Sequence, residues 1–162
     1  MTTSDWTHYF EQLAEKHSSV LHSPTAKHFF RAEVEDFFQD IRSRAKFPAV
    51  MLESCALDLT VQASLFATER TLAFTVIDSC RVDDYPAITE TQSRCETIAQ
   101  SFLGRLLRDI QDDYLGGVRL VSAHFELIEN VPLHYYGQRV ELVVSEPVCP
   151  YSNPNDWIDE TH

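Results

Sequence analysis

PAITETQSRCETIAQSFLGRLLRDIQDDY, from Pro86 to Tyr114, is the stretch of sequence that decides the fold. Its apolar residues recur with the spacing of one helical face, which predicts a single long amphipathic helix. Gly116 and Gly117 come next, and glycine readily adopts the left-handed backbone conformation in which helices commonly end. The apolar stripe consists of Ile88, Thr91, Cys95, Ile98, Phe102, Leu106 and Ile110, and Ala99, Leu103 and Leu107 widen it.

Two segments on each side of this helix have the alternating pattern of β-strands. Phe47–Glu53 and Glu69–Asp78 precede the helix, and Val118–Glu129 and Gln138–Glu146 follow it. This order predicts an α+β fold, in which a ββαββ unit forms an antiparallel or mixed sheet and the long helix packs on one face. The alternation of Val118–Glu129 is imperfect, and residues 54–66 are compatible with a loop or with a short extra strand.

Helical patterns dominate the N-terminal part of the chain. A first short helix is predicted from a cap at Ser4 to about His17. A second is predicted from a cap at Ser23 or Thr25, with Pro24 tolerated in the first turn, because the apolar residues from Phe30 to Ala45 follow one stripe with a 3.6-residue period. Four phenylalanines lie on or near this stripe, so it either caps the sheet or meets another subunit.

The length of 162 residues predicts a single domain. We expect an α+β domain over residues 1–146, made of a helical N-terminal part (residues 1–46) and the sheet with its long helix (residues 47–146). Prolines and acidic residues dominate the rest, so residues 147–162 are expected to form an extended acidic tail. A chain of this size can remove about 70% of its unfolded-chain surface from water, so its core needs no disulfide or metal.

The formal net charge of −12 limits the classes of partner. An acidic surface repels phosphate, so we expect neither direct sequence-specific binding of nucleic acid nor binding to membranes. No apolar run approaches the roughly 20 residues of a membrane span, and the N-terminus lacks the pattern of a signal peptide. Widely spaced cysteines without a paired motif are typical of reduced thiols, so we expect a cytoplasmic protein.

Asp78, Asp83 and Asp84 form the best cluster of carboxylates, at a predicted strand-to-helix junction. One or two of them could bind a hard cation such as Mg²⁺. A helix cap in a solvated turn is the simpler interpretation, because aspartate is a favoured capping residue. The sequence has no paired histidine motif, and its four glycines leave little backbone for a phosphate-binding loop. We therefore expect no catalytic residues, no bound metal and no cofactor.

The layout of residues 47–147 resembles that of a known family. It contains FPAVMLE, a strand ending in VIDSC, the long helix, SAHFELIENV and a closing YYGQRVELVVSEP. This layout is similar to the small tail-completion or tail-terminator proteins of phages and phage-derived contractile machines. The resemblance implies helices packed against a mixed or antiparallel sheet, a ring that is typically hexameric at the end of a tail tube, and no catalytic residues.

Three functions are compatible with these patterns. The first is a non-enzymatic assembly subunit that forms a ring and contacts other tail or particle proteins, in the cytoplasm or in a phage-like particle. The second is a small metal-dependent hydrolase or nuclease that uses the aspartate cluster and Glu53. The third is a small-ligand or peptide-binding module with a groove between sheet and helix. Candidates for the subunit interface are the aromatic residues Phe29, Phe30, Phe37, Phe38 and Trp157.

Overall fold

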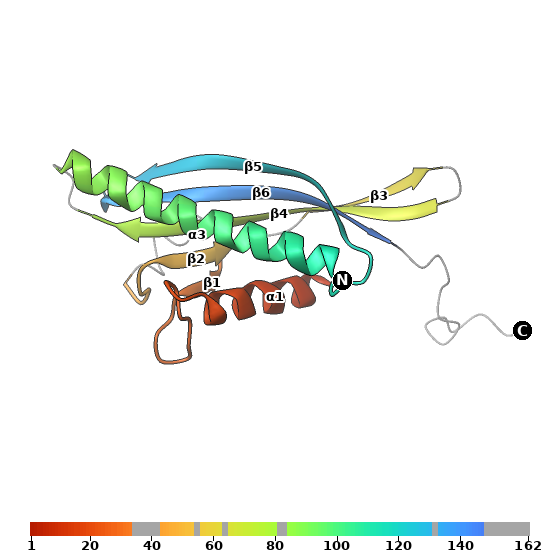
Figure 1. Cartoon of the computed structure of the whole chain (residues 1–162), viewed down its shortest axis with the longest axis horizontal. Helices are drawn as coiled ribbons and strands as arrows, with labels where there is room; N and C mark the ends of the chain where they lie inside the picture. Colours follow the sequence, from red (N-terminus) through yellow and green to blue (C-terminus); the bar gives the residue numbers. More distant parts are fainter. Residues whose placement is uncertain (34–42, 54–55, 63–64, 81–83, 131–132, 148–162) are drawn as a thin grey trace, which may run out of the picture.

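The computed structural model of the chain describes residues 1–33, 43–53, 56–62, 65–80, 84–130 and 133–147 (Figure 1). The elements, in chain order, are α1 (Thr3–Lys16), β1 (Phe29–Arg31), β2 (Ala49–Leu52), β3 (Ala56–Gln62), β4 (Leu65–Ser79), α3 (Tyr85–Gln111), β5 (Arg119–Asn130) and β6 (Tyr135–Pro147). The α+β fold predicted from the sequence is confirmed. An N-terminal helix and the long helix α3 accompany one six-stranded sheet.

The sheet is mixed and has the strand order β1-β2-β4-β6-β5. β1 is parallel to β2, and the other pairs are antiparallel. β6 occupies one edge of β4, so the other edge holds two strands in series: β2 opposite Phe74–Ile77 and β3 opposite Leu65–Thr71. The β3–β4 hairpin projects past both helices as an arm, which we call the β3 arm (Figure 1).

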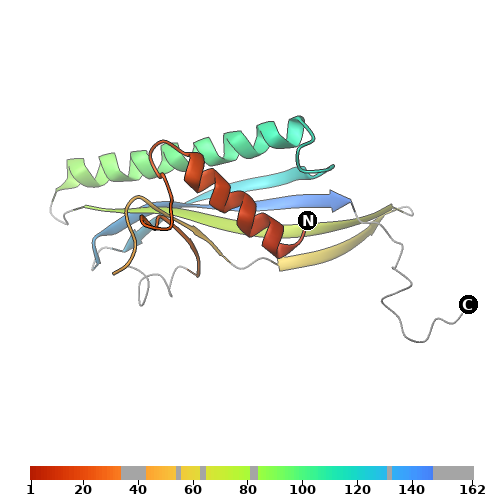
Figure 2. The ribbon, with the colours of Figure 1, turned by 90° about the horizontal axis from the view of Figure 1, so that it is seen from below.

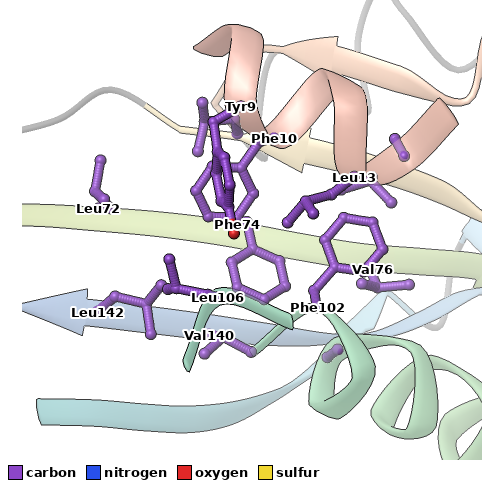
Figure 3. Packing of buried hydrophobic residues seen from close by; sticks show 14 of the residues in the cluster. Tyr9, Phe10, Leu13, Leu72, Phe74, Val76, Phe102, Leu106, Val140 and Leu142 are labelled. Carbon is purple, nitrogen blue, oxygen red and sulfur yellow. The ribbon is translucent and has the colours of Figure 1, made fainter. Parts of the chain in front are cut away.

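Both helices cover the same face of the sheet (Figure 2). Phe10 of α1 and Phe102 of α3 pack on Phe74 in β4, with ring centroids 5.2 and 5.8 Å from that of Phe74 (Figure 3). Leu72 and Val76 lie on the same face of β4 and are fully buried in this helix-side cluster. Burial of each such side chain contributes about 1.5–3 kcal/mol, so this cluster fixes both helices on the sheet.

A smaller apolar cluster lies on the opposite face of the sheet. Ala49, Met51 and Ile77 are fully buried there. Phe47 and Tyr135 pack against them and stack on each other, with ring centroids 5.3 Å apart. The other two residues of β2 belong to the helix-side cluster, so the two-residue period of this strand supplies both faces.

Local sequence signals explain where the helices begin. α1 starts after Thr2, whose hydroxyl accepts a hydrogen bond from the N–H of Asp5, while the Asp5 carboxylate accepts one from the N–H of Thr2. The predicted cap at Ser4 is therefore wrong by two residues, because the acidic residue that completes the capping box is three positions after Thr2. The sequence predicts a cap at Asp83 or Asp84 for α3, and the structure assigns it to Asp84, which accepts a hydrogen bond from the N–H of Ala87.

α3 ends at Gln111, before the predicted glycine end. Asp113 adopts the left-handed conformation (φ 53°) ahead of Gly116 (φ 62°) and Gly117 (φ 79°). Its carboxylate accepts a hydrogen bond from the N–H of Gly117 at 2.8 Å. Aspartate is one of the few residues besides glycine that tolerate this conformation, so the helix ends earlier than the glycines alone indicate.

The predicted second helix is wrong at its start. Phe29–Arg31 form β1, which pairs with β2. A strand sends neighbouring side chains to opposite faces, so Phe29 enters the helix-side cluster and Phe30 packs against the smaller cluster. This pairing is non-local, so the spacing of apolar residues within the segment could not reveal it. Residues 34–42, in the middle of that predicted helix, lie outside the described residues.

Two other segments become clear in the structure. Residues 54–66, ambiguous in the sequence, contribute β3 and the first residues of β4, which decides between the loop and the extra strand. The imperfect alternation of the strand after α3 comes from a bulge in β5, where the register shifts between Leu120 and Ser122.

Candidate functional site

The carboxylates of the predicted aspartate cluster have separate structural roles. Asp78 is buried at the end of β4 and accepts hydrogen bonds from Arg94 Nη2 and from the N–H of Ser79, both at 2.7 Å. Asp84 caps α3. Asp83 lies outside the described residues. Within the described ranges, no three histidine, cysteine, aspartate or glutamate side chains come together as a metal site would require.

Glu53, the fourth carboxylate of the hydrolase hypothesis, belongs to a buried ion pair. Arg139 donates to it from Nε and Nη2 at 3.0 and 2.9 Å, and the Thr75 hydroxyl donates at 3.0 Å. Arg139 also lies 3.3 Å from Glu141 and 3.7 Å from Glu126. The hydrogen bonds to Glu53 raise the pKa of Arg139, so this side chain stays cationic. The group holds β2, β4 and β6 together.

The aromatic residues chosen from the sequence as interface candidates have mixed positions. Phe29 is 7% exposed and belongs to the helix-side cluster. Phe30 is partly buried against the smaller cluster. Both therefore take part in packing within the chain. Phe37, Phe38 and Trp157 lie outside the described residues.

Exposed apolar side chains lie instead on two edge strands of the sheet, β3 and β5, while the third edge strand of the described sheet, β1, has three residues. In the described part of the chain, β3 pairs with β4 alone and β5 with β6 alone, so each has an outer edge without a partner strand. Leu57 and Leu59 of β3 are 53% and 64% exposed, and Val121 and Leu127 of β5 are 55% and 51% exposed. This feature was not predicted from the sequence, because residues 54–66 are compatible with either a loop or a strand.

The composition of β3 is unusual for a free edge. Native edge strands are commonly protected by lysine, proline, a bulge or a covering element, which prevents pairing with other chains. β3 has the sequence ALDLTVQ, with Asp58 as its one charged residue. Its leucines lie opposite Arg70 and Thr68, on the side of the sheet that the helices cover elsewhere, and the β3 arm projects past that cover (Figure 1).

A pocket of about 220 Å³ lies between α1 and α3. Its apolar lining comes from Tyr9 and Leu13 of α1 and from Phe102 of α3, with Tyr114 beyond the helix end. The remaining lining residues are polar or charged: Gln12, Lys16, His17, Ser101, Arg105 and Asp109. The pocket therefore combines an aromatic floor with several hydrogen-bonding groups.

A hydrogen-bond network closes one side of the pocket. The Tyr9 hydroxyl donates to Asp109 at 2.9 Å, and Arg105 Nε donates to both Asp109 oxygens at 2.8 and 3.0 Å. Burial, together with the bond to Asp109, raises the pKa of Tyr9 far above its usual range, so the hydroxyl stays a donor. Burial lowers the pKa of His17, whose ring lies 5.5 Å from that of Phe102. His17 is thus neutral near pH 7.

The thiol of Cys95 is a core group, as the sequence predicts. It is fully buried on α3, and its Sγ lies 3.6 Å from the carbonyl oxygen of Tyr136. Burial raises the pKa of Cys95 to about 12. A thiol needs a lowered pKa to act as a nucleophile, so Cys95 is inert.

Comparison with known proteins adds no family. The sequence matches no protein-family model and no curated protein. Among the described helices, none is both long enough and apolar enough to cross a membrane.

Proposed function

We propose that this protein is a non-enzymatic structural subunit that self-associates into a ring, as a tail-terminator or tail-completion protein of a phage or phage-like particle does. The observation that carries the proposal is the pair of strands β3 and β5, each of which has exposed apolar side chains and an outer edge without a partner among the described strands. The α+β fold agrees with the family layout that the sequence resembles, and that layout supplies the biological setting.

The two outer strands differ from each other, which determines the kind of assembly. If β3 of one copy meets β5 of the next, each copy uses two different surfaces, and the contact is heterologous. A heterologous contact generates a ring when the rotation between copies closes, and an open filament when it does not. Neighbouring strands in a sheet are rotated by about 20–25°, so edge-to-edge pairing adds a rotation at every contact.

The enzymatic alternative lacks support from the described side chains. A metal-dependent hydrolase needs carboxylates that converge on open space. Asp78 is paired with Arg94, Asp84 caps a helix, and Glu53 is held by Arg139. Each of these three carboxylates, the members of the set that the structure describes, already has a hydrogen-bonding partner within the fold.

The test is the oligomeric state of two leucine variants. Leu59→Asp places a charge on the exposed face of β3 and is expected to reduce the assembly to monomers. Leu21→Asp is the matched control, because Leu21 is 59% exposed but lies in the connection after α1, in a left-handed conformation that aspartate tolerates. We expect the control to assemble like the wild type.

Light scattering on a sizing column, over a range of protein concentrations, gives the masses directly. Circular dichroism confirms that each variant is folded. A wild-type protein that stays monomeric at every concentration would contradict the ring proposal. If the L59D protein assembles like the wild type, β3 is not part of the interface.

A further inference from the structure

The end of the described chain lies beside the pocket between α1 and α3. β6 ends at Pro147, and a Cβ placed on Gly117 would lie 3.2 Å from Pro147 Cγ. Gly117 is three residues after Tyr114, which lines the pocket. Figures 1 and 2 agree that the start of α1, the end of α3 and the end of β6 lie near one another, close to the base of the β3 arm.

An open groove joins this region to the pocket. The groove has a volume of about 540 Å³, and its lining includes Met1, Leu115 and Gly116, close to where β6 ends. It shares Tyr9, Gln12 and Tyr114 with the pocket. Groove and pocket are therefore continuous along α1, and a segment that follows Pro147 has a path into the pocket.

The pocket carries positive charge on a strongly acidic protein. The Lys16 side chain is exposed, and its ammonium group has no hydrogen bond or ion pair within the described part of the chain. Arg105 uses Nε for Asp109, while its side chain remains 53% exposed, which leaves its terminal nitrogens for another acceptor. Asp109 offsets one of these two charges, and neutral His17 adds none.

Residues 148–162 have the complementary chemistry. They contain Trp157, flanked by Asp156, Asp159 and Glu160, and no lysine or arginine. An apolar cavity of about 150 Å³ holds a benzene ring, so about 220 Å³ is enough for an indole. Acidic groups on either side of that ring match the free cationic groups at the rim of the pocket.

We propose that residues 148–162 fold back along the groove of their own chain and insert Trp157 into the pocket between α1 and α3. The ten residues from Pro147 to Trp157 span up to about 33 Å when extended. The whole of α1, with 14 residues, is about 21 Å long. The segment therefore reaches every part of the pocket, and Asp159 and Glu160 then follow Trp157 towards Lys16.

The fluorescence of the full chain tests the insertion. The chain has two tryptophans, and Trp6 is fully buried, so the spectrum of wild type minus that of Trp157→Phe isolates Trp157. We expect this difference spectrum to lie at shorter wavelength than that of a tryptophan in water. We also expect acrylamide to quench Trp157 several-fold less than it does in the urea-unfolded chain.

Charge reversal tests whether the pocket, and not another part of the surface, protects Trp157 from solvent. Lys16→Glu is expected to restore the solvent-exposed emission and quenching of Trp157. Lys27→Glu makes the same change of charge on an exposed lysine that does not line the pocket, and is expected to leave Trp157 protected. Circular dichroism checks the folding of both variants.

Two results would overturn the proposal. One is a Trp157 that is as accessible to acrylamide in the folded protein as in the unfolded chain. The other is protection that disappears on dilution, which would assign Trp157 to the surface of a second copy. Protection that persists on dilution and is lost in K16E, with K27E unchanged, supports insertion within one chain.

Discussion

Gly137 occupies the tightest position that the structure gives to any glycine of this chain. It lies in β6 between Ile77 of β4 and Ile128 of β5. A Cβ at this position would lie 2.3 Å from the carbonyl oxygen of Val76 and 3.1 Å from Cα of Ile77. Both atoms belong to the backbone of the central strand, so they cannot move aside as a flexible side chain would.

Gly137→Ala is therefore expected to lower the free energy of unfolding by about 1–3 kcal/mol, the usual cost of overpacking. Gly104→Ala is the matched control, because an added Cβ there meets nothing within 4 Å. Gly104 lies in the exposed interior of α3, where alanine is about 0.5–1 kcal/mol better than glycine. Urea unfolding should give opposite signs for the two variants, and equal signs would contradict this account.

At the scale of single residues, the sequence predicts roles that depend on near neighbours. A helix cap within the aspartate cluster and a core position for Cys95 are both confirmed, with Asp84 as the cap, because capping and helical spacing are local. The pairing of Asp78 with Arg94 was not predicted, because it joins a strand to a helix across an intervening turn. The aspartate cluster therefore looked more available to a metal than it is.

Glu146 joins two elements that are far apart in the sequence, the start of α1 and the end of β6. It accepts hydrogen bonds from the Trp6 indole at 2.7 Å, Arg70 Nε at 3.0 Å and the amino group of Met1 at 2.8 Å. Burial alone raises the pKa of Glu146, but the hydrogen bonds from Met1, Trp6 and Arg70 outweigh it and lower the pKa. The ionised carboxylate therefore stabilises the fold.

A lowered pKa in the folded state gives a stabilisation that is complete above the unfolded pKa and is lost as the pH falls through the folded pKa. The ordinary glutamate value here is 4.5, so the loss is expected below that pH. Glu146→Gln should cost about 2 kcal/mol near neutral pH, the scale of charge-assisted hydrogen bonds. Its disadvantage relative to wild type should shrink in acid.

Urea titrations from neutral pH down to about 3 measure this change. Glu90→Gln is the control, because Glu90 is exposed on α3. The substitution removes the same charge, but from a position without such hydrogen bonds. A difference between E146Q and wild type that stays constant down to the lowest pH would contradict the assigned role of the carboxylate.

Helices and strands were predictable where the pattern that defines them lies within a single segment of the sequence. The 3.6-residue period of α3 and the alternation of β4 and β6 are visible in the sequence because each places one regular set of apolar side chains in the helix-side cluster. β1 was missed because its strand conformation depends on β2 as a partner. The pocket was also beyond the sequence, because it forms where α1 packs beside α3, some 90 residues later in the chain.

The whole molecule carries a net charge of −12, which opposes its own assembly. Copies that meet through apolar strand edges must overcome this repulsion, and salt screens it. Raising the ionic strength from about 0.01 to 0.15 M shortens the Debye length from about 30 to 8 Å. We therefore expect the oligomeric fraction to rise with salt.

Sedimentation velocity at the two ionic strengths measures this directly. The L59D protein serves as the control, since it is expected to remain monomeric at both. Assembly that weakens as salt is added would show that opposite charges, and not apolar edges, hold the copies together.

The place of β6 in the strand order has a consequence for how the chain is made on the ribosome. β6 is the last described strand to be synthesised, yet it lies between β4 and β5 and joins them. Until it emerges, β5 has no partner among the described strands, and β4 is open along the edge that β6 later fills. A nascent chain that stops short of residue 135 therefore lacks two strand pairings, β4 with β6 and β5 with β6. Both of them form only after the last described strand has been synthesised.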